Sequence, residues 1–230
     1  ELLELSEKYK ELSGGAFDVY SGPLFDLWGF GFTSDSLPSD EAIERALADC
    51  QAGKILKFIG IAQGYSCDIV AEYLYSIGVK DMLVDIGEIF CDGVNHGGKP
   101  WRVGVDRPFD GNNDPGTDLD GIWESQNAPC GIVTSGNYRK FYVHDGKKYA
   151  HTIDPRTGYP VQHNLLSATI VAKDATDADA YATYCMVIGL DKAKEFIERS
   201  PDDLAGYLIY ADENGEMHEW ASENFNLSKR

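Results

Sequence analysis

The chain has 230 residues, of which 43% are hydrophobic and 12% aromatic, and its formal net charge at pH 7 is −18. A chain of this length buries about 70% of its unfolded surface, so we expect a substantial core and a single domain over residues 1–230, or two closely joined lobes. No apolar run reaches the length of a transmembrane helix. The negative charge argues against nucleic acid as a partner, because proteins that bind it neutralise phosphates with Lys and Arg.

Helical patterns dominate the first eighty residues. The opening residues predict a helix that stops at Gly14, and Ser39 is a favourable N-cap for a second helix because acidic residues follow it. A third helix is expected after Gly64, ending near Gly78, and the apolar residues Met82–Val84 predict a strand after it.

Strand patterns follow from residue 100 onward. Phe141–His144 and Lys147–Ala150 flank Asp145-Gly146, a dipeptide that favours a β-hairpin turn. The stretch 107–121 is rich in Asp, Gly, Asn and Pro, which predicts a surface excursion. The other expected elements are strands at 101–105, 131–134, 165–171 and 206–210, and helices at 174–189 and 191–200. This mixture predicts an α+β fold in which mixed or antiparallel sheets are flanked by helices.

The cysteines follow no recognised metal-binding or disulfide pattern. The five cysteines show neither CxxC nor His-paired spacing, so the sequence signals neither a zinc site nor a disulfide framework, and we expect small buried hydrophobic side chains. The cysteines are Cys50, Cys67, Cys91, Cys130 and Cys185.

The chain starts inside a helical pattern without an initiator Met, and we interpret it as a fragment that lacks an N-terminal part.

The densest group of reactive side chains lies in residues 149–160. This segment contains His151, Asp154 and Arg156 together with the turn formers Pro155 and Gly158. Pro155 fixes its own φ and Gly158 permits a left-handed turn, so we expect a rigid loop that holds the imidazole and the carboxylate in set directions. Loops of this kind often carry function.

A second candidate site lies on the helix predicted at 174–189. Asp179 and Thr183 are four residues apart, so they stack on one helix face and offer two hard oxygen ligands that suit Mg²⁺. A metal would also give this acidic chain a place to hold phosphate. On spacing alone an alternative stays open, in which Asp179 interacts with the helix dipole and Thr183 bonds back to a carbonyl.

Short motifs are spread along the rest of the chain. They are Gly14-Gly15-Ala16-Phe17-Asp18, Gly22-Pro23-Leu24, Leu27-Trp28-Gly29-Phe30-Gly31, Ile61-Ala62-Gln63-Gly64-Tyr65, Pro100-Trp101-Arg102-Val103-Gly104 and Thr134-Ser135-Gly136-Asn137-Tyr138, followed by residues 151–158 and the Asp179/Thr183 pair. In kind and order they resemble the FAD:protein FMN transferases, the ApbE family, formerly described as thiamine biosynthesis lipoproteins. The resemblance runs from about residue 13 to the end of the chain.

The resemblance implies an enzyme that cleaves FAD at its pyrophosphate and transfers FMN to a Ser or Thr hydroxyl of an acceptor flavoprotein, releasing AMP. The nucleophile belongs to the acceptor, so no Ser-His-Asp triad is expected in this chain. Such group transfer depends on positioning, on charge neutralisation by a metal and on a base that takes the hydroxyl proton.

Most of the family's reactive positions fall on residues already singled out, and Gly60 is added by the resemblance. By resemblance, Asp179, Thr183 and the backbone carbonyl of Gly60 are ligands for Mg²⁺, and a carbonyl ligand imposes no requirement on its own side chain. His151 matches the histidine proposed as the base, which Asp154 could tune. The alternative for His151 is a side chain that only hydrogen-bonds within its loop.

Further residues match the family's flavin-contacting positions. They are Leu27, Trp28, Gly29, Phe30, Lys57, Gln63 and Ile153, with Gly29 allowing close approach of FAD and the aromatic rings able to stack on it. For the aromatic residues, ordinary core packing is an equally open alternative.

Three positions depart from the family pattern. Lys57 stands where an acidic cofactor contact is expected, and Gln63 replaces a Lys or Glu, a milder change because the amide still donates and accepts. The segment around Gly87 lacks the second glycine of a Gly-Gly pair. Three hypotheses therefore remain: an FMN transferase, a metal-dependent FAD pyrophosphatase, and a non-catalytic flavin-binding protein.

The resemblance also implies a location. Family members usually carry a lipoprotein signal ahead of this region, so we expect an extracytoplasmic, periplasmic protein that meets the membrane only through a lipid anchor absent from this chain. The acceptor flavoprotein lies on another chain, and its identity is not encoded in these residues.

Overall fold

The computed structural model describes residues 1–30, 37–110, 112, 114, 116–126, 128–138, 141–200 and 203–229, so Gly31 of the motif at 27–31 lies outside the described residues. The chain divides into two compact units. The first comprises Glu1–Ile59 and Lys140–His163, and the second comprises Gly60–Arg139 and Asn164–Arg230. The predicted α+β class is confirmed, whereas a single domain over residues 1–230 stays a prediction.

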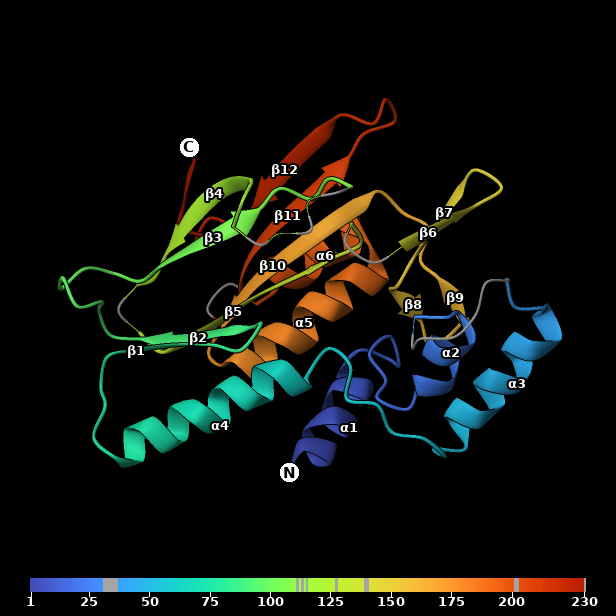
Figure 1. The fold of residues 1–230 in the computed structure, drawn as a ribbon, viewed down its shortest axis with the longest axis horizontal. Helices are drawn as coiled ribbons and strands as arrows, with labels where there is room; N and C mark the ends of the chain where they lie inside the picture. Colours follow the sequence, from blue (N-terminus) through green and yellow to red (C-terminus); the bar gives the residue numbers. More distant parts are fainter. Residues whose placement is uncertain are drawn as a thin grey trace. The chain divides into compact units, whose positions relative to one another are not determined.

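In the described part of the first unit, the chain forms helices and two hairpins (Figure 1). Its elements are α1 (Leu2–Leu12), α2 (Gly22–Leu27), α3 (Asp40–Gln51), β6 (Phe141–His144), β7 (Lys147–Ala150), β8 (Ile153–Asp154) and β9 (Tyr159–Pro160). Ser39 is the N-cap of α3 as predicted, because its Oγ accepts a hydrogen bond of 3.3 Å from the Ala42 N–H. Asp145 and Gly146, at φ 49° and 75°, form the predicted turn between β6 and β7.

The segment 149–160 is more regular than the predicted loop. Its first two residues complete β7, and β8 then pairs with β9 in a short hairpin. The Asp154 carbonyl accepts hydrogen bonds from the N–H groups of Thr157 and Gly158, at 3.2 and 2.8 Å, and Gly158 has φ 82°. The left-handed turn at Gly158 is therefore confirmed, but two-residue strands are too short to produce a readable period of two in the sequence.

Within its described residues, the second unit contains two antiparallel sheets and three helices. The larger sheet has the strand order β1-β2-β5-β10-β11-β12, and the smaller has the order β13-β4-β3. The elements are α4 (Ala62–Ser76), β1 (Met82–Asp85), β2 (Ile89–Asp92), β3 (Arg102–Asp106), β4 (Leu119–Glu124), β5 (Cys130–Gly136), β10 (Leu165–Ala172), α5 (Ala175–Ile188), α6 (Leu190–Glu198), β11 (Ala205–Ala211), β12 (Met217–Ala221) and β13 (Leu227–Lys229). None of the helices in the described part of the chain has the length and hydropathy needed to span a membrane.

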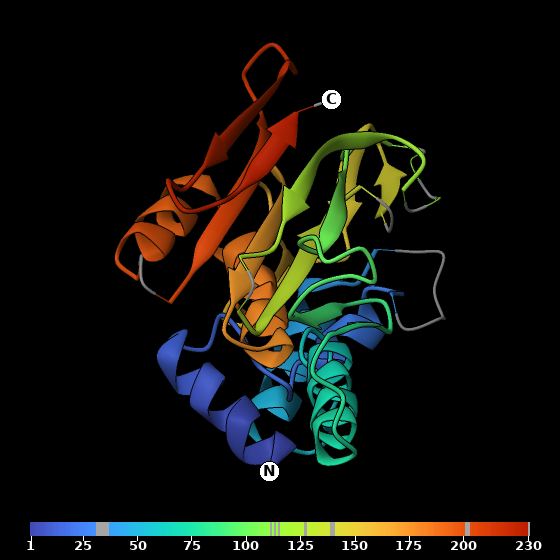
Figure 2. The ribbon, with the colours of Figure 1, turned by 90° about the vertical axis from the view of Figure 1, so that its left-hand side faces the viewer.

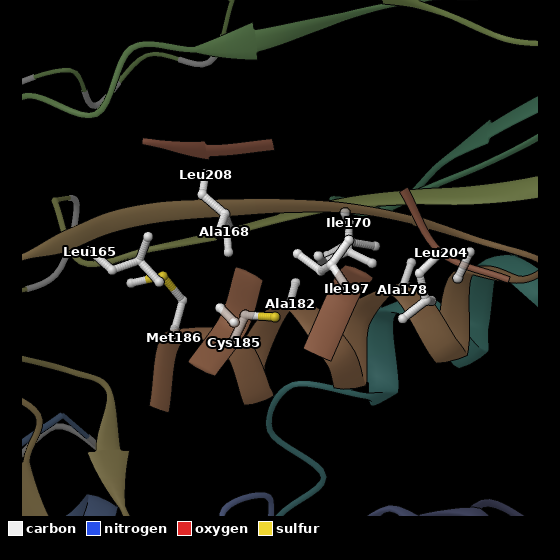
Figure 3. Packing of buried hydrophobic residues seen from close by; sticks show 13 residues of the cluster. Leu165, Ala168, Ile170, Ala178, Ala182, Cys185, Met186, Ile197, Leu204 and Leu208 are labelled. Carbon is white, nitrogen blue, oxygen red and sulfur yellow. The ribbon is translucent and has the colours of Figure 1, made fainter. Parts of the chain in front are cut away.

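The six-stranded sheet packs on both faces (Figure 2). On one face, Ala168 and Ile170 of β10 and Leu208 of β11 contact the apolar sides of α5 and α6 (Figure 3). On the other face, Tyr207 and Ile209 pack against the three-stranded sheet. Each large apolar side chain buried in this way contributes about 1.5–3 kcal/mol. The sheet is thus a rigid support for α5, the helix that carries the predicted metal ligands.

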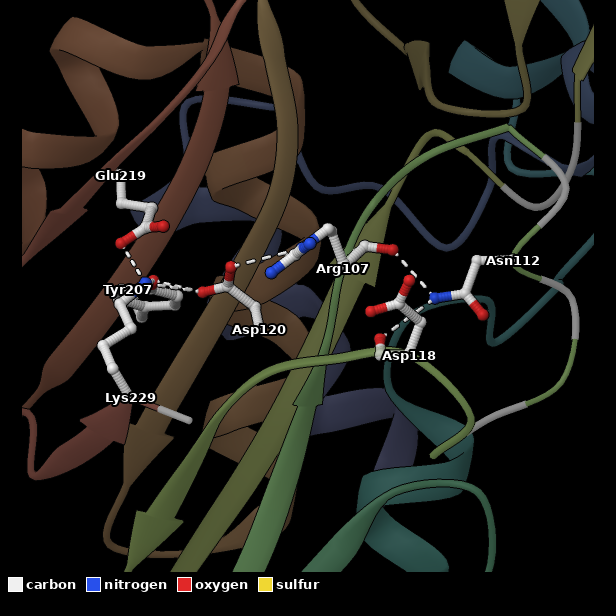
Figure 4. A network of polar contacts seen from close by, with 7 residues as sticks. All are labelled: Arg107, Asn112, Asp118, Asp120, Tyr207, Glu219 and Lys229. Carbon is white, nitrogen blue, oxygen red and sulfur yellow. Dashed lines mark hydrogen bonds and ion pairs between the residues drawn. The ribbon is translucent and has the colours of Figure 1, made fainter.

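Part of the predicted surface excursion at 107–121 belongs to the smaller sheet, because β4 begins at Leu119. Asn112 lies inside the excursion but is only 4% exposed. Its side-chain amide donates hydrogen bonds to the carbonyls of Arg107 and Asp118, at 2.9 and 3.3 Å (Figure 4). A buried amide thus draws the two ends of the excursion together, which its composition did not reveal.

A buried polar network connects the two sheets (Figure 4). Asp120 on β4 accepts hydrogen bonds from the Tyr207 hydroxyl at 2.5 Å and from Lys229 Nζ at 2.9 Å, and Arg107 lies 3.7 Å from its other oxygen. Lys229 also pairs with Glu219. Burial acts to raise the pKa of Asp120, but the hydrogen bonds from Tyr207 and Lys229 outweigh it and hold the pKa below its ordinary value.

We expect Asp120→Asn to lower the free energy of unfolding by about 2–3 kcal/mol at pH 7, because Tyr207 and Lys229 lose a buried ionised acceptor. The Asp120 pKa is depressed in the folded state, so its stabilisation is complete above its unfolded pKa of about 4 and is lost as the pH falls further. Urea unfolding should therefore show a difference in stability between wild type and Asp120→Asn at pH 7 that narrows as the pH falls below about 4. Glu213→Gln, at an exposed carboxylate, is the control, and equal stability of Asp120→Asn and wild type at pH 7 would refute this role.

Candidate functional site

The helix that carries Asp179 and Thr183 starts and stops as the sequence predicted. Asp174 is the N-cap of α5, with its carboxylate accepting a 2.7 Å hydrogen bond from the Asp177 N–H. Gly189 ends the helix at φ 80°, a conformation that favours glycine. Both predicted ligands therefore lie on one regular helix, one turn apart.

Asp179, on α5, is a buried carboxylate that lies against the first turn of another helix, α4. Its side chain is 4% exposed, and its Oδ2 accepts a 3.1 Å hydrogen bond from the Gly64 N–H in the first turn of α4. N–H groups in a first helical turn have no partner within their own helix, so this carboxylate satisfies one of them. Burial nevertheless raises the pKa of Asp179 to about 6. Among the described residues, no Lys, Arg or His forms an ion pair with it.

Gly60 and Thr183 lie in direct contact. Gly60 has φ 75°, and a Cβ atom at this position would lie 2.5 Å from Thr183 Oγ1. Both the backbone conformation and the space require glycine. The expectation that any side chain is tolerated at Gly60 is therefore wrong, because the threonine hydroxyl occupies the place of the missing methyl group.

The two helices fix each other's first turns. Asp68 on α4 accepts hydrogen bonds from the N–H groups of Ala175 and Thr176 of α5, at 2.9 and 2.8 Å, and from the Thr176 hydroxyl. Asp179 on α5 does the same for Gly64 of α4. A Cβ atom at Gly64 would lie 2.2 Å from the Ala175 carbonyl oxygen, so the helices approach closely. These reciprocal contacts hold the Asp179 carboxylate in a fixed position.

The residues present fit a divalent cation. A carboxylate, a hydroxyl and a carbonyl are hard oxygen donors of the kind that Mg²⁺ and Ca²⁺ prefer. Asp179 and Thr183 lie on one helix face, Gly60 contacts Thr183, and the buried Asp179 carboxylate has no cation beside it among the described residues. A bound cation would compensate the cost of burying this charge.

Gly60→Ala should weaken metal binding by at least about tenfold, because the methyl group must displace the Thr183 hydroxyl and the backbone must leave its left-handed conformation. Gly78→Ala is a matched control, since Gly78 also has positive φ, 91°, but has nothing within 4 Å of an added Cβ. Isothermal titration calorimetry with Mg²⁺ measures both variants. Equal affinities would mean that the contact between Gly60 and Thr183 does not shape the site.

The predicted flavin-contacting residues Trp28 and Phe30 lie in the first unit. Trp28 is 4% exposed, stacks on Tyr149 with ring centroids 5.8 Å apart, and donates a 2.7 Å hydrogen bond to the Gly158 carbonyl. Its ring therefore packs in the core. For Trp28 this agrees with core packing, the alternative to a flavin contact that the sequence left open. Phe30 is partly exposed, with its ring centroid 6.3 Å from that of His151.

The neighbours of these rings have local structural roles. Gly29 has φ 80° immediately after the C-cap of α2, which accounts for a glycine there. Leu27 is half-buried and Ile153 is buried in β8, and both belong to the same apolar cluster as Trp28. The structure thus brings Leu27, Trp28, Phe30 and Ile153 together, and their contact with a flavin stays a prediction.

His151 is half-buried directly after β7. The residue proposed to tune it, Asp154, instead binds Arg156, whose Nε and Nη2 lie 2.8 and 2.7 Å from the two carboxylate oxygens. Arg156 therefore pairs with an acidic neighbour within its own turn. Asp154 also accepts a hydrogen bond from the Arg156 N–H, so this carboxylate holds the turn.

Lys57 and Gln63, the departures from the family pattern, each have a partner. Lys57 forms an ion pair with Asp26, next to the motif at 27–31, so its charge is locally balanced. The Gln63 side-chain amide donates a 3.3 Å hydrogen bond to the Ile86 carbonyl and lies against Gly87, where a Cβ would be 2.4 Å from its nitrogen. Gln63 therefore supports the segment around Gly87, which lacks the family's second glycine. A contact between Gln63 and the cofactor stays a prediction.

Sequence reasoning missed two residues that position the metal-ligand group. Gly64 brings α4 close to α5, and Asp68 caps α5 from the neighbouring helix. The sequence placed Gly64 just before the expected helix, whereas α4 begins at Ala62 and includes it, with Asp68 four residues further on the same helix face. The partners of both residues lie more than a hundred residues away in the sequence.

Comparisons with known proteins agree with this geometry. The model of the ApbE family matches residues 1–208. A protein named FAD:protein FMN transferase from Escherichia coli K12 is 35% identical over 92% of this chain and 64% of its own length, and one from Klebsiella pneumoniae is 32% identical over 98% and 68%. The chain thus spans slightly less than two thirds of the length of the E. coli relative.

Solved structures show the same fold. The flavin transferase ApbE from Vibrio cholerae superposes with a TM-score of 0.82 at 31% identity, covering 97% of this chain and 74% of that one. The apo form of the flavinyl transferase ApbE from Pseudomonas stutzeri gives a TM-score of 0.81 at 31% identity, covering 96% and 71%.

Proposed function

Because the chain belongs to the ApbE family, we propose that it transfers FMN from FAD to a Ser or Thr hydroxyl of an acceptor flavoprotein and releases AMP. The names of the E. coli and Klebsiella relatives and of the Vibrio structure support this reaction. The observation within this chain that supports it most is the oxygen group formed by the buried Asp179 with the half-buried Gly60 and Thr183.

We propose that this oxygen group holds Mg²⁺, which would neutralise charge on the FAD pyrophosphate when bound. Asp179 supplies the ionised ligand, and its bond from the Gly64 N–H fixes one oxygen while the other remains for a cation. Thr183 and the Gly60 carbonyl add neutral oxygen atoms. The acidic chain, at −18, otherwise has little means of attracting phosphates.

In the proposed reaction the acceptor hydroxyl attacks the phosphorus of the FMN half of FAD. The bond from this phosphorus to the bridging oxygen breaks, and AMP leaves with that oxygen. His151 takes the hydroxyl proton, a role suited to a partly exposed imidazole beside a half-buried aromatic ring. The residues at 27–30 and 153 would contact the flavin, mainly through backbone in the case of the buried Trp28 and Ile153.

An extracytoplasmic location is part of the same proposal and is supported only by the resemblance to lipid-anchored family members. An acceptor flavoprotein in that compartment would be the natural partner. Fractionation of the host cells tests this location. Detection of the full-length protein in the membrane fraction would support it, and detection in the cytoplasmic fraction would contradict it.

AMP release from FAD tests the proposed reaction. The purified chain is incubated with FAD and Mg²⁺, with and without a candidate acceptor domain, and nucleotides are separated by chromatography. We expect AMP only when acceptor is present. AMP and free FMN without acceptor would show an FAD pyrophosphatase, and bound FAD that survives both conditions would show a flavin-binding protein without turnover.

A further inference from the structure

Two of the five cysteines face each other across neighbouring strands of the larger sheet. Cys91 on β2 is the register partner of Cys130 on β5, and their Sγ atoms are 3.7 Å apart. At this separation the two thiols are within hydrogen-bonding distance, and either sulfur can be the donor. No sequence pattern indicates this contact, because 38 residues lie between the two cysteines.

The backbone already has the geometry that a disulfide requires. Directly opposed residues of an antiparallel pair have Cα atoms about 4.5–5.5 Å apart, within the range of about 4.4–6.8 Å found for disulfides. The sulfur atoms need to approach by only about 1.7 Å to reach a bond of about 2.0 Å, which side-chain rotation can supply.

We propose that Cys91 and Cys130 are a disulfide-forming pair that joins β2 to β5. The oxidant is a low-molecular-weight disulfide or a disulfide-bearing oxidoreductase. The Cys130 thiolate attacks one sulfur of that disulfide and releases one thiol. The Cys91 thiolate then attacks the Cys130 sulfur and releases the second thiol, so two protein thiols are oxidised and one external disulfide is reduced.

Exposure favours this order of attack. Cys130 is partly exposed, whereas Cys91 is fully buried beside it. The hydrogen bond between the two thiols also holds the pKa of Cys130 below its ordinary value, which increases the thiolate fraction of the exposed partner. The resolving thiol is already in contact, so the mixed disulfide has an immediate internal route to closure.

The other three cysteines serve as internal references. Cys50, Cys67 and Cys185 are buried, and burial raises the pKa of each thiol. Cys67 donates a 3.0 Å hydrogen bond to the Glu88 carbonyl, and Cys185 lies in the core against β10. We expect all three to stay reduced in the folded protein.

The proposed bond closes a loop that contains β3 and β4, two strands of the smaller sheet. Closing a loop of about 40 residues restricts the unfolded chain strongly. We therefore expect the oxidised protein to melt about 10 °C above the reduced protein.

Thiol counting tests the proposal. The chain is equilibrated with oxidised glutathione, denatured under acid quench, and titrated with a thiol reagent. Three free thiols are expected, against five after reduction, and tryptic mass spectrometry should join the Cys91 and Cys130 peptides, which trypsin separates at Arg102. Five free thiols, a stable glutathione adduct at Cys130, or a link to another cysteine would each overturn the proposal.

Variants give a second measurement. Cys91→Ala and Cys130→Ala should each abolish the difference in melting temperature between oxidised and reduced protein, whereas Cys50→Ala, in the first unit, should retain it. If an alanine variant does not fold, the thiol count and peptide map of the unmodified chain still decide the matter. A redox-dependent shift that persists in Cys91→Ala would contradict the assignment.

Discussion

Asp179→Asn is expected to reduce FMN transfer by at least about 10³-fold, because the only ionised ligand of the proposed metal group is lost. The amide oxygen still accepts the hydrogen bond from Gly64, so the contact between α4 and α5 survives. Calorimetry should show that Mg²⁺ affinity is lost together with activity. Asp177→Asn is the matched control, since that carboxylate lies on the same helix but pairs with Lys173 at 3.0 Å.

Although Asp179→Asn is expected to abolish activity, it should stabilise the metal-free protein. The pKa of Asp179, raised to about 6 by burial, lies about two units above its ordinary value of 3.8, so ionisation opposes folding above that range. At pH 7.5 in EDTA, Asp179→Asn should be more stable than wild type by about 2 kcal/mol, or about 5 °C in melting temperature. The gap should close near pH 4. A fully active variant, or one destabilised in EDTA, would remove Asp179 from the metal site.

His151→Gln is expected to reduce transfer by about 10²–10⁴-fold while leaving Mg²⁺ and FAD affinity unchanged, because a general base acts only when the acceptor hydroxyl reacts. Glutamine keeps polar atoms near the ring of Phe30 but cannot take up the proton. Single-turnover assays at saturating FAD separate this effect on chemistry from any effect on binding.

His144→Gln provides the matched control for that experiment. His144 lies in the neighbouring hairpin strand β6, is about half exposed, and sits 3.4 Å from the Asp145 carboxylate. We expect its substitution to leave the transfer rate within a factor of about two. Equal rates for wild type and His151→Gln would show that another group accepts the proton.

Local signals in the sequence were sufficient for the elements that carry the predicted ligands. Asp174 and Gly189 mark the ends of α5 through cap chemistry, and Asp145-Gly146 marks a turn through its positive φ values. Ser39 likewise marks the start of α3, as its N-cap. In each case the determining interaction lies within a few residues along the chain, which is why a single sequence reveals it.

Long-range packing explains what the sequence did not reveal. Strands β2, β12 and β13 are short and show no simple alternation, because both faces of β2 are partly covered and β12 is largely exposed. The need for glycine at Gly60 depends on Thr183, and the role of Asp68 depends on the start of α5. These partners are more than a hundred residues away, so neither spacing nor propensity could predict them.

Metal-dependent transfer is tested most simply by the mass of an acceptor domain after incubation with this chain and FAD, in Mg²⁺ and in EDTA. We expect the acceptor to gain the mass of one FMN in Mg²⁺, substitution of its acceptor hydroxyl to prevent the gain, and EDTA and Asp179→Asn each to abolish it. A mass gain that is equal in Mg²⁺ and in EDTA would contradict the assignment of Gly60, Asp179 and Thr183 as the metal group on which transfer depends.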